Sequence, residues 1–533
     1  MKNIKLLDCT LRDGGYLNDW AFGYNNIVNI FDRLCSATID VIEIGFLDER
    51  RVKDYDRTIM PNCEAINEIF GSLDKGNSIV VGMIDFGTCN IETLLPSNEC
   101  YLDGIRVIFK KNDMVAAIDY CQQIKQLGYE VFVQAVSITS YSDDEYMELI
   151  KLVNKLNPYA FSVVDTYGLL HKVQLMHYFK LANTHLKESI GLGYHSHNNF
   201  QLAYANCIEI IETAPNNRTI LVDGTLYGMG KGAGNAPLEL LAMYMNENLN
   251  KVYDIEQILE AINVNILGMY ESVPWGYSLK FFISALHSCH PNYVTYLMEK
   301  KTLSMKSIND VLRKIEEQNK LFYDQEHIEQ LYLVHQKQDC DDTEYIEQLK
   351  KIFYQKDILL LGSGNSIVNE RNTIQNFMDT NKPVVIAVNY LPEYDVDFIF
   401  ISNSLRYVQM ASRLKNLDSK VKLIATSNVA KAKGRFDYKL RYSSLLDEKA
   451  QFVDNPLIML IKLMDDCKAK RVELAGFDGY STSKVPDYVD SDMEYSFTKE
   501  KAIEINNDTI ASLSRLDIST VVSFITKSLY VIE

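Results

Sequence analysis

The sequence LLDCTLRDGGY, residues 6–16, decides the fold and the chemistry that we expect of this chain. An apolar run ends in Arg12 and Asp13, and two glycines follow directly. This pattern is typical of a strand that runs into a tight turn. A permanent cation and a carboxylate are then expected at the C-terminal edge of the strand, which is where parallel β/α barrels place their active sites.

Apolar runs of similar length recur through the first 225 residues. They lie at 4–10, 41–46, 79–85, 104–110, 130–136, 160–166, 190–197 and 219–225. Most intervals hold one segment of helical period, such as residues 114–127 and 143–156. Near-continuous apolar runs suit strands buried on both faces of a parallel sheet, and eight of them with helical spacers are typical of a (β/α)8 or TIM barrel. We predict this barrel over residues 1–265; an open doubly wound sheet is the alternative.

The rest of the chain divides into two further parts. Residues 266–356 are predicted to form a helical extension followed by a solvated helical connector, because residues 320–356 contain neither Gly nor Pro. Strand-like runs such as 383–390 and 422–428 then alternate with helical segments. Residues 357–533 are therefore predicted to form a Rossmann-like α/β domain, whose role the pattern does not define.

Composition restricts the partners and the location of the protein. A net charge of −17 argues against a nucleic-acid binder, which needs a basic surface. The ten cysteines form no Cys-x-x-Cys pair, which fits a reducing cytoplasm better than a disulfide framework. No uncharged apolar run approaches the length of a membrane span, and the N-terminus leads directly into a strand. We expect a cytoplasmic homo-oligomer that acts on small molecules, with neither a signal peptide nor a membrane span.

A second motif, GYHSHNN at residues 193–199, ends the seventh predicted strand. His195 and His197 are two residues apart, so their side chains point to the same side of a strand. With Asp13 they offer two nitrogens and one oxygen to a divalent ion, and we favour Mn or Mg over Zn or Co for such mixed ligands. A surface or core histidine pair is the alternative that the spacing alone leaves open.

A third motif, GMGKGAGNAP at residues 228–237, follows the last predicted strand. Its glycines permit close backbone approach to a ligand, and Gly232 is predicted to contact substrate. Asn235 is predicted to add an oxygen to the metal, with a helix cap as the alternative. An ordinary β/α turn would have the same composition.

These motifs together resemble the DRE-TIM metallolyase (HMGL-like) family. The resemblance rests on DCTLRDGG, on VIEIGF with Glu43, on HSHNN and on GMGKGAGNAPLE, and it covers residues 1–300. The last motif looks most like that of the 4-hydroxy-2-oxovalerate aldolases. The resemblance implies a metal-dependent aldolase or lyase that uses the enolate of a pyruvate-type 2-oxo acid and an aldehyde. The roles that it implies are metal ligation by Asp13, His195 and His197, with Asn235 in some branches, enolate stabilisation by Arg12 and orientation of the site by Glu43.

One position departs from the aldolase pattern. Those enzymes have a histidine base three residues after the motif's Asp, whereas this chain has Tyr16. A phenol is a poor base at neutral pH, so Tyr16 either donates a hydrogen bond to a substrate hydroxyl or the base lies elsewhere. The candidates for that base are Glu43, Asp85, His287, His290 and a metal-bound water.

Two further polar residues, Gln134 and Asp165, stand at the ends of predicted strands. We predict that both contact the substrate, and a polar brace within the barrel is the alternative.

In the second α/β region, the turn Gly362-Ser363-Gly364-Asn365-Ser366 follows a strand. Backbone N–H groups in such a turn can hold a phosphate, so Gly362, Ser363, Gly364 and Ser366 are predicted nucleotide contacts. The third glycine of the dinucleotide fingerprint is missing, and Asn389 stands where an acidic residue is expected, so NAD is not predicted. The turn faintly resembles the nucleotide-sugar site of bacterial sialyltransferase-like domains; a scaffold domain is the alternative.

The function predicted from the whole chain is a pyruvate-type aldolase or lyase in surface-polysaccharide or modified-sugar biosynthesis. Two alternatives stay open. One is a Claisen-type enzyme that condenses an acyl-CoA. The other is a catalytically altered barrel joined to a nucleotide-sugar-binding or transferase domain.

Overall fold

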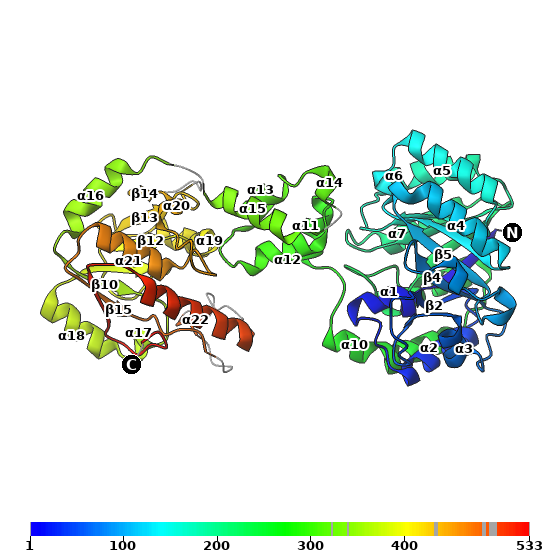
Figure 1. Cartoon of the computed structure of the whole chain (residues 1–533), viewed down its shortest axis with the longest axis horizontal. Helices are drawn as coiled ribbons and strands as arrows, with labels where there is room; N and C mark the ends of the chain where they lie inside the picture. Colours follow the sequence, from blue (N-terminus) through cyan, green and yellow to red (C-terminus); the bar gives the residue numbers. More distant parts are fainter. Residues whose placement is uncertain are drawn as a thin grey trace. The chain divides into compact units, whose positions relative to one another are not determined.

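The computed structural model describes residues 2–320, 323–337, 340–430, 435–481, 487–489 and 498–531. The chain forms two compact units, Met1–Pro291 and Asn292–Glu533. In Figure 1 the first unit is coloured blue to green and the second green to red.

The first unit is a closed parallel barrel, as predicted. Its strands are β1 (Asn3–Asp8), β2 (Val41–Leu47), β4 (Ile79–Asp85), β5 (Gly104–Phe109), β6 (Glu130–Ala135), β7 (Ala160–Asp165), β8 (Gly191–Ser196) and β9 (Thr219–Gly224). Each strand pairs in parallel with its neighbours, and pairing between β1 and β2 closes the ring. A two-residue strand, β3 (Ile59–Met60), adds to β2.

Helices follow most strands and cover the outside of the ring (Figure 1). They are α2 (Tyr24–Ser36), α3 (Cys63–Phe70), α4 (Met114–Gln126), α5 (Asp143–Leu156), α6 (Lys172–His185), α7 (Ala203–Thr213) and α8 (Leu238–Leu249). Helix α5 shows why they form: Ser142 and Glu145 make a capping box, and Tyr146, Leu149 and Val153 recur at helical spacing on its buried face. After α8 come α9 (Ile255–Ala261), α10 (Leu267–Ser272) and α11 (Leu279–Leu286).

The barrel interior changes from apolar to polar between two layers of side chains. Val41, Phe132, Ala160 and Leu221 belong to one buried apolar cluster. Two residues further along the same strands stand Glu43, Gln134, Ser162 and Asp223, all buried. Inward positions of a strand are two residues apart, so this polar layer lies one step nearer the C-terminal ends of the strands.

The second unit begins with helices and continues as a parallel sheet. The helices are α12 (Pro291–Glu299), α13 (Met305–Leu312), α14 (Glu317–Lys320), α15 (Gln325–Gln336) and α16 (Thr343–Phe353). The strands are β10 (Asp357–Leu361), β11 (Val384–Val388), β12 (Phe398–Ile401), β13 (Lys422–Thr426), β14 (Tyr438–Leu440), β15 (Arg471–Ala475) and β16 (Val521–Phe524), in the order β14-β13-β12-β11-β10-β15-β16. The predicted α/β architecture is confirmed, and β14 and β16 are strands that the apolar pattern does not predict.

Alternate residues of these strands face two separate cores. Ile358 and Leu360 of β10 join α16 (Thr343–Phe353) and α21 (Pro456–Asp466) on one face. Leu359 and Leu361 join α17 (Ser366–Asn369), α18 (Arg371–Asn381) and α19 (Ser404–Leu414) on the other. The remaining helices are α20 (Tyr442–Leu445) and α22 (Lys499–Arg515). Both faces of the sheet are therefore covered, as buried parallel strands require.

None of the helices in the described residues is both long and apolar enough to cross a membrane.

Gly45 allows the backbone of β2 to approach Thr58 closely, and a substitution at this position tests that contact. Its φ is +143°, and a Cβ there would lie 1.9 Å from the carbonyl oxygen of Thr58, at an irregularity in the pairing of β2 with β4. We expect Gly45→Ala to lower the free energy of unfolding by about 2–4 kcal/mol through strain and overlap. Urea unfolding followed by tryptophan fluorescence measures it, because Trp20 and Trp275 both lie in the barrel unit.

The matched control is Gly76→Ala, at a position with φ +53° and nothing within 4 Å of the added Cβ. It should cost only about 1–2 kcal/mol, from the backbone conformation alone. Equal losses in the two variants would contradict the role of the Thr58 contact.

Candidate active site

The first site element is a short helical turn rather than the end of a strand. β1 ends at Asp8 and α1 (Thr10–Asp13) follows, so the predicted extension of the strand to residue 10 is wrong. The Asp8 carboxylate accepts hydrogen bonds from the backbone N–H of Thr10 at 3.0 Å and from its hydroxyl at 2.6 Å, which turns the chain at once. The Thr10 hydroxyl accepts a hydrogen bond from the N–H of Leu226 at 2.8 Å and ties this turn to the loop after β9.

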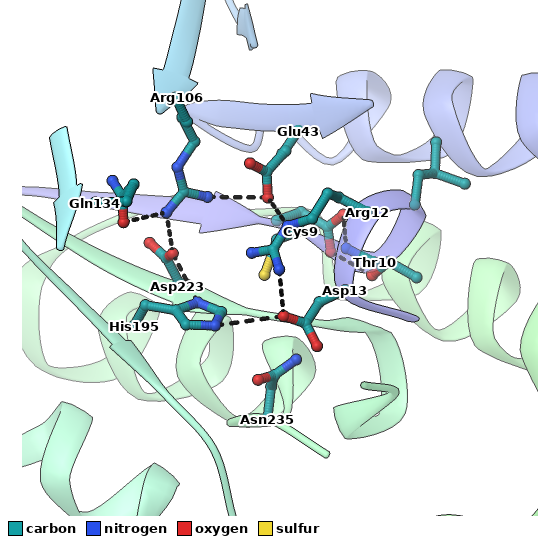
Figure 2. Close-up of polar contacts among 12 residues, drawn as sticks. Cys9, Thr10, Arg12, Asp13, Glu43, Arg106, Gln134, His195, Asp223 and Asn235 are labelled. Carbon is teal, nitrogen blue, oxygen red and sulfur yellow. Dashed lines mark hydrogen bonds and ion pairs between the residues drawn. The ribbon is translucent and has the colours of Figure 1, made fainter. Parts of the chain in front are cut away.

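Glu43 on β2 holds two buried arginines (Figure 2). Its Oε2 accepts a hydrogen bond from Nε of Arg12 at 2.8 Å and lies 3.0 Å from Nη1 of Arg106, an ion pair without hydrogen-bond alignment. Arg12 also donates from Nη1 to Asp13, and Arg106 donates from Nη2 to Asp223. All five side chains are buried, so their charges are balanced by one another rather than by water.

The two predicted histidines meet Asp13 beside this network. Nε2 of His195 and Nε2 of His197 lie 3.4 and 3.9 Å from Oδ2 of Asp13. Nδ1 of His195 faces Asp223 at 3.0 Å, and Nδ1 of His197 faces the carbonyl oxygen of Lys231 at 3.1 Å. These acceptors favour a proton on each Nδ1, which leaves both Nε2 lone pairs directed at Asp13, as in metal-ligating histidines.

These residues fit a divalent cation on three counts. The ligand atoms of Asp13, His195 and His197 lie within 4.8 Å of one another. Oδ1 of Asn235 is buried without a hydrogen-bond partner among the described residues, and Figure 2 shows this side chain close to Asp13. Three carboxylates and two guanidiniums leave the network with one net negative charge, which a divalent cation would reverse. The structure thus brings all four predicted ligands together, and their roles remain predictions.

Burial and charge determine the protonation of these groups. Burial raises the pKa of Asp13, but Arg12 and the two histidines outweigh it and hold that pKa well below its usual value. Burial lowers the pKa of His197 to about 4, so its ring is neutral. Burial also lowers the pKa of His195, but hydrogen bonds to Asp13 and Asp223 outweigh it and raise the pKa overall. A cation at Nε2 would therefore compete with a proton on His195.

Tyr16 lies three residues after Asp13 and is 40% exposed. Its ring packs edge-on against Trp20 and Phe46, with centroid distances of 4.9 and 6.2 Å, and Nζ of Lys231 lies 5.2 Å from its centroid. Desolvation raises the pKa of the phenol above its usual value, although Arg12 opposes this. The hydroxyl is protonated at neutral pH, which suits the predicted hydrogen-bond donor better than a base, and the role of Tyr16 stays a prediction.

The glycine-rich loop after β9 docks on both other motifs. Gly232 has φ +70°, and a Cβ there would lie 2.8 Å from Oδ1 of Asn199, which accepts a hydrogen bond from the N–H of Ala233 at 2.9 Å. The N–H of Lys231 donates to Oδ1 of Asp13 at 2.9 Å. Close approach therefore explains the glycine at 232, and its contact with substrate stays a prediction.

The two remaining rim residues are placed differently. Gln134 accepts a hydrogen bond from Arg106 at 3.3 Å and donates one to Ser162 at 2.9 Å, so it belongs to the buried network. Asp165 accepts hydrogen bonds from two backbone N–H groups of the loop after β7, at 2.8 and 3.0 Å. Burial raises its pKa to about 6. The geometry of Asp165 matches the alternative of a polar brace, and a substrate contact by either residue stays a prediction.

Sequence reasoning does not single out Asp223 or Lys231 as site residues. Asp223 was detectable as a charged residue two positions after Leu221 in an apolar strand, which places it in the barrel interior. Lys231 is the single charged residue of the motif GMGKGAGNAP, and its ammonium lies beside Tyr16.

In the second unit, the predicted phosphate turn is already bonded within the chain. The N–H groups of Gly362 and Gly364 donate to carbonyl oxygens of β15 and the residue after it, both at 2.8 Å. The N–H of Ser366 donates to Asp478 at 2.7 Å, and so does its hydroxyl. The carboxylate of Asp478 thus occupies the place where a phosphate was expected. Nucleotide binding by Gly362, Ser363, Gly364 and Ser366 stays a prediction.

Comparison with known proteins now identifies the barrel. Residues 3–264 match the protein-family model described as HMGL-like. The barrel belongs to the HMGL-like family. The family comprises metal-dependent aldolases, lyases and acyl-CoA condensing enzymes, so a divalent metal and lyase-type carbon–carbon chemistry are expected of the HMGL-like barrel.

Individual relatives are distant. An oxaloacetate decarboxylase from Mycobacterium tuberculosis is 25% identical over 319 residues, which cover 58% of this chain and 90% of that protein. A 4-hydroxy-2-oxovalerate aldolase from Geobacillus genomosp. 3 is 23% identical over 261 residues, which cover 48% of this chain and 75% of that protein. A crystal structure of an HMG-CoA lyase from Bacillus subtilis aligns with a TM-score of 0.42 and 13% identity, over 52% of this chain and 94% of that one.

Asp223 gives a test of the metal centre that leaves the predicted ligands intact. Asp223→Asn keeps the shape of the side chain but removes the charge that pairs with Arg106 and orients His195. We expect affinity for Mn²⁺ to fall by about 10–100-fold, since groups that orient a ligating histidine have effects of this size. Calorimetric titration of the metal-free protein measures the change.

The control is Asp143→Asn on α5, which removes a carboxylate that also faces a histidine, His177 at 2.8 Å, but on the surface. It should leave Mn²⁺ affinity unchanged. A folded Asp223→Asn protein with the wild-type affinity would contradict the assignment of this metal centre.

Proposed function

We propose that the barrel makes or breaks a carbon–carbon bond next to the carbonyl group of a 2-oxo acid, through a pyruvate-type enolate. The observation that supports this most directly is the position of Arg12. Glu43 and Asp13 hold its Nε and Nη1 beside the cluster of His195 and His197. Nη2 makes no hydrogen bond with any described residue, so this donor is available to a substrate oxygen.

The residues of the site have complementary tasks in such a reaction. A divalent cation, when bound, withdraws electron density from the substrate's carbonyl group. Arg12 presents a permanent positive charge where negative charge develops on the enolate oxygen, and Glu43 prevents it from moving. The ammonium of Lys231 lies 5.2 Å from the ring centroid of Tyr16, and we assign proton transfer to the substrate to this pair.

Two candidate reactions differ in the fragment that leaves the substrate, which is an aldehyde in one and CO2 in the other. In an aldol cleavage, a base removes the proton of the substrate's hydroxyl group, an aldehyde departs and the enolate is then protonated. His290 is one of the predicted bases, and burial and the nearby Lys231 lower the pKa of its ring. An aldehyde derived from a sugar would suit the role predicted in surface-polysaccharide or modified-sugar biosynthesis.

Decarboxylation is the second candidate, and Tyr16 favours it. When a 3-carboxylate leaves as CO2, the bonding electron pair becomes the enolate, and only a proton donor is needed. Position 16 holds such a donor in place of a base. The similarity to an oxaloacetate decarboxylase agrees with this reading.

Arg12→Lys tests the enolate chemistry shared by both candidates. Lysine keeps the charge but cannot contact Glu43, Asp13 and a substrate oxygen at once. We expect the metal-dependent exchange of pyruvate methyl protons in D2O, followed by NMR, to slow by about 100-fold or more. Arg313→Lys, at a side chain directly after α13 that is 65% exposed, is the control and should exchange at the wild-type rate. Undiminished exchange in metal-loaded Arg12→Lys would rule out this role of Arg12.

Tyr16→His and Tyr16→Phe separate aldol cleavage from decarboxylation. Each variant is assayed with 4-hydroxy-2-oxovalerate and with oxaloacetate, after subtraction of the decarboxylation caused by free metal. A base at position 16 should raise the ratio of aldol cleavage to decarboxylation by at least about tenfold in Tyr16→His, and Tyr16→Phe should slow decarboxylation. A ratio unchanged by Tyr16→His would show that position 16 does not exchange protons with the substrate.

A further inference from the structure

The second unit contains a cleft of about 570 Å³ that the barrel chemistry does not use. Its floor is formed by Gly362–Gly364 after β10, Asn389 after β11 and Gly476–Tyr480 after β15. The chain proceeds from β10 to one edge of the sheet and then returns to the other side of β10 with β15. The cleft therefore lies at the C-terminal ends of the strands where the strand order reverses, which is where open parallel sheets bind ligands.

The cleft is not built for a phosphate. The carboxylate of Asp478 accepts hydrogen bonds from both the N–H and the hydroxyl of Ser366, so a negative group already fills the turn after β10. The helix that follows, α17, has only four residues and provides little dipole. A phosphate at this turn would have to displace Asp478 or lie against it.

Charges around the cleft are balanced rather than cationic. The lining cations are Lys300, Lys301, Arg406 and Lys501, and the lining carboxylates are Glu299, Glu329, Asp454, Asp478 and Asp487. Lys300 is paired with Glu329 at 2.8 Å, and Lys501 with Glu504 at 3.2 Å. With no excess of positive charge, the lining favours an uncharged ligand over a phosphorylated one.

Aromatic rings and a fixed carboxylate supply the remaining recognition chemistry. Tyr296, Tyr332, Phe452, Tyr480 and Tyr488 all line the cleft. Lys300 lies over Tyr296 and Tyr332, both at 4.8 Å, and Lys501 over Phe452 at 4.5 Å, so a ligand would use the other faces of these rings. Oδ2 of Asp454 accepts hydrogen bonds from the hydroxyls of Tyr332 at 2.9 Å and Tyr442 at 3.0 Å. Its other oxygen makes no hydrogen bond within the part of the chain that the structure describes, so it can accept one from a ligand hydroxyl.

We propose that this cleft binds an uncharged, hydroxyl-rich ring, namely a sugar or a nucleoside. The ring packs its apolar face on the aromatic side chains, and Asp454 accepts a hydrogen bond from one of its hydroxyl groups. Free sugars and nucleosides share this chemistry and differ in what is attached to the ring. The assignment rests only on the second unit and is independent of the reaction proposed for the barrel.

Binding to the full-length protein distinguishes the ligand classes. The probes are glucose, N-acetylglucosamine, uridine and adenosine, each compared with its monophosphate by saturation-transfer NMR titration. We expect at least one uncharged probe to bind with a Kd of about 1 mM or tighter, and its phosphate to bind less than about fivefold tighter. The probe that binds shows whether the source is a sugar or a nucleoside. Binding of no uncharged probe, or a phosphate that binds fivefold tighter or more, overturns the proposal.

Two variants locate the bound probe. Asp454→Asn should weaken binding by about tenfold, because a charge-assisted hydrogen bond is lost, and Phe452→Leu should weaken it by removing an aromatic face. Asp379→Asn, at an exposed carboxylate of α18 outside the cleft, is the matched control and should bind as the wild type does. Phe452→Leu keeps the hydrogen bonds of Asp454 to Tyr332 and Tyr442. It therefore tests the cleft even if Asp454→Asn fails to fold. Wild-type affinity in both variants overturns the assignment of the cleft.

Discussion

The interior of the barrel depends on one buried carboxylate, Glu43, which neutralises two arginines. Removing a guanidinium from water costs several kcal/mol, and it is tolerated only where a carboxylate replaces the lost hydration. Glu43 does this for Arg12 and Arg106 together, while Asp13 and Asp223 complete the pairing. Each charge is needed to keep another one buried, so the network holds Arg12 rigidly beside the two histidines.

The same strands that form the apolar layer of the barrel also carry the charged groups of the network. Val41 and Leu221 fill an apolar layer, and Glu43 and Asp223 stand two residues further along the same strands. On each of these strands, an apolar inward side chain is followed by a charged one at the next inward position. The strands, which are rigid, therefore position these polar groups. Segments after the strands contribute Arg12, Asp13 and His197, and the glycine-rich loop is tied to Asp13 and Asn199 by hydrogen bonds.

In the second unit a carboxylate, that of Asp478, binds a backbone turn rather than buried arginines. Asp478 binds the turn after β10 from within the chain, at a place where related sheets hold a ligand's phosphate. The Gly362-Ser363-Gly364 pattern alone cannot reveal this, because Asp478 lies more than 100 residues downstream and follows another strand. Local sequence predicts the turn, whereas the group that occupies it is decided by which strands become neighbours.

Sequence by itself determined the barrel, its strands to within one or two residues, and the meeting of Arg12, Asp13, His195 and His197, because apolar periodicity and strand-end motifs are local signals. It also predicted the α/β character of the second half. Only the tertiary structure decided that Arg12 and Asp13 sit on a helical turn, that Asp223 and Lys231 lie beside the predicted ligands, and that burial raises the pKa of the Tyr16 phenol. These depend on contacts between strands far apart in the chain and on desolvation, which exist only once the barrel has closed.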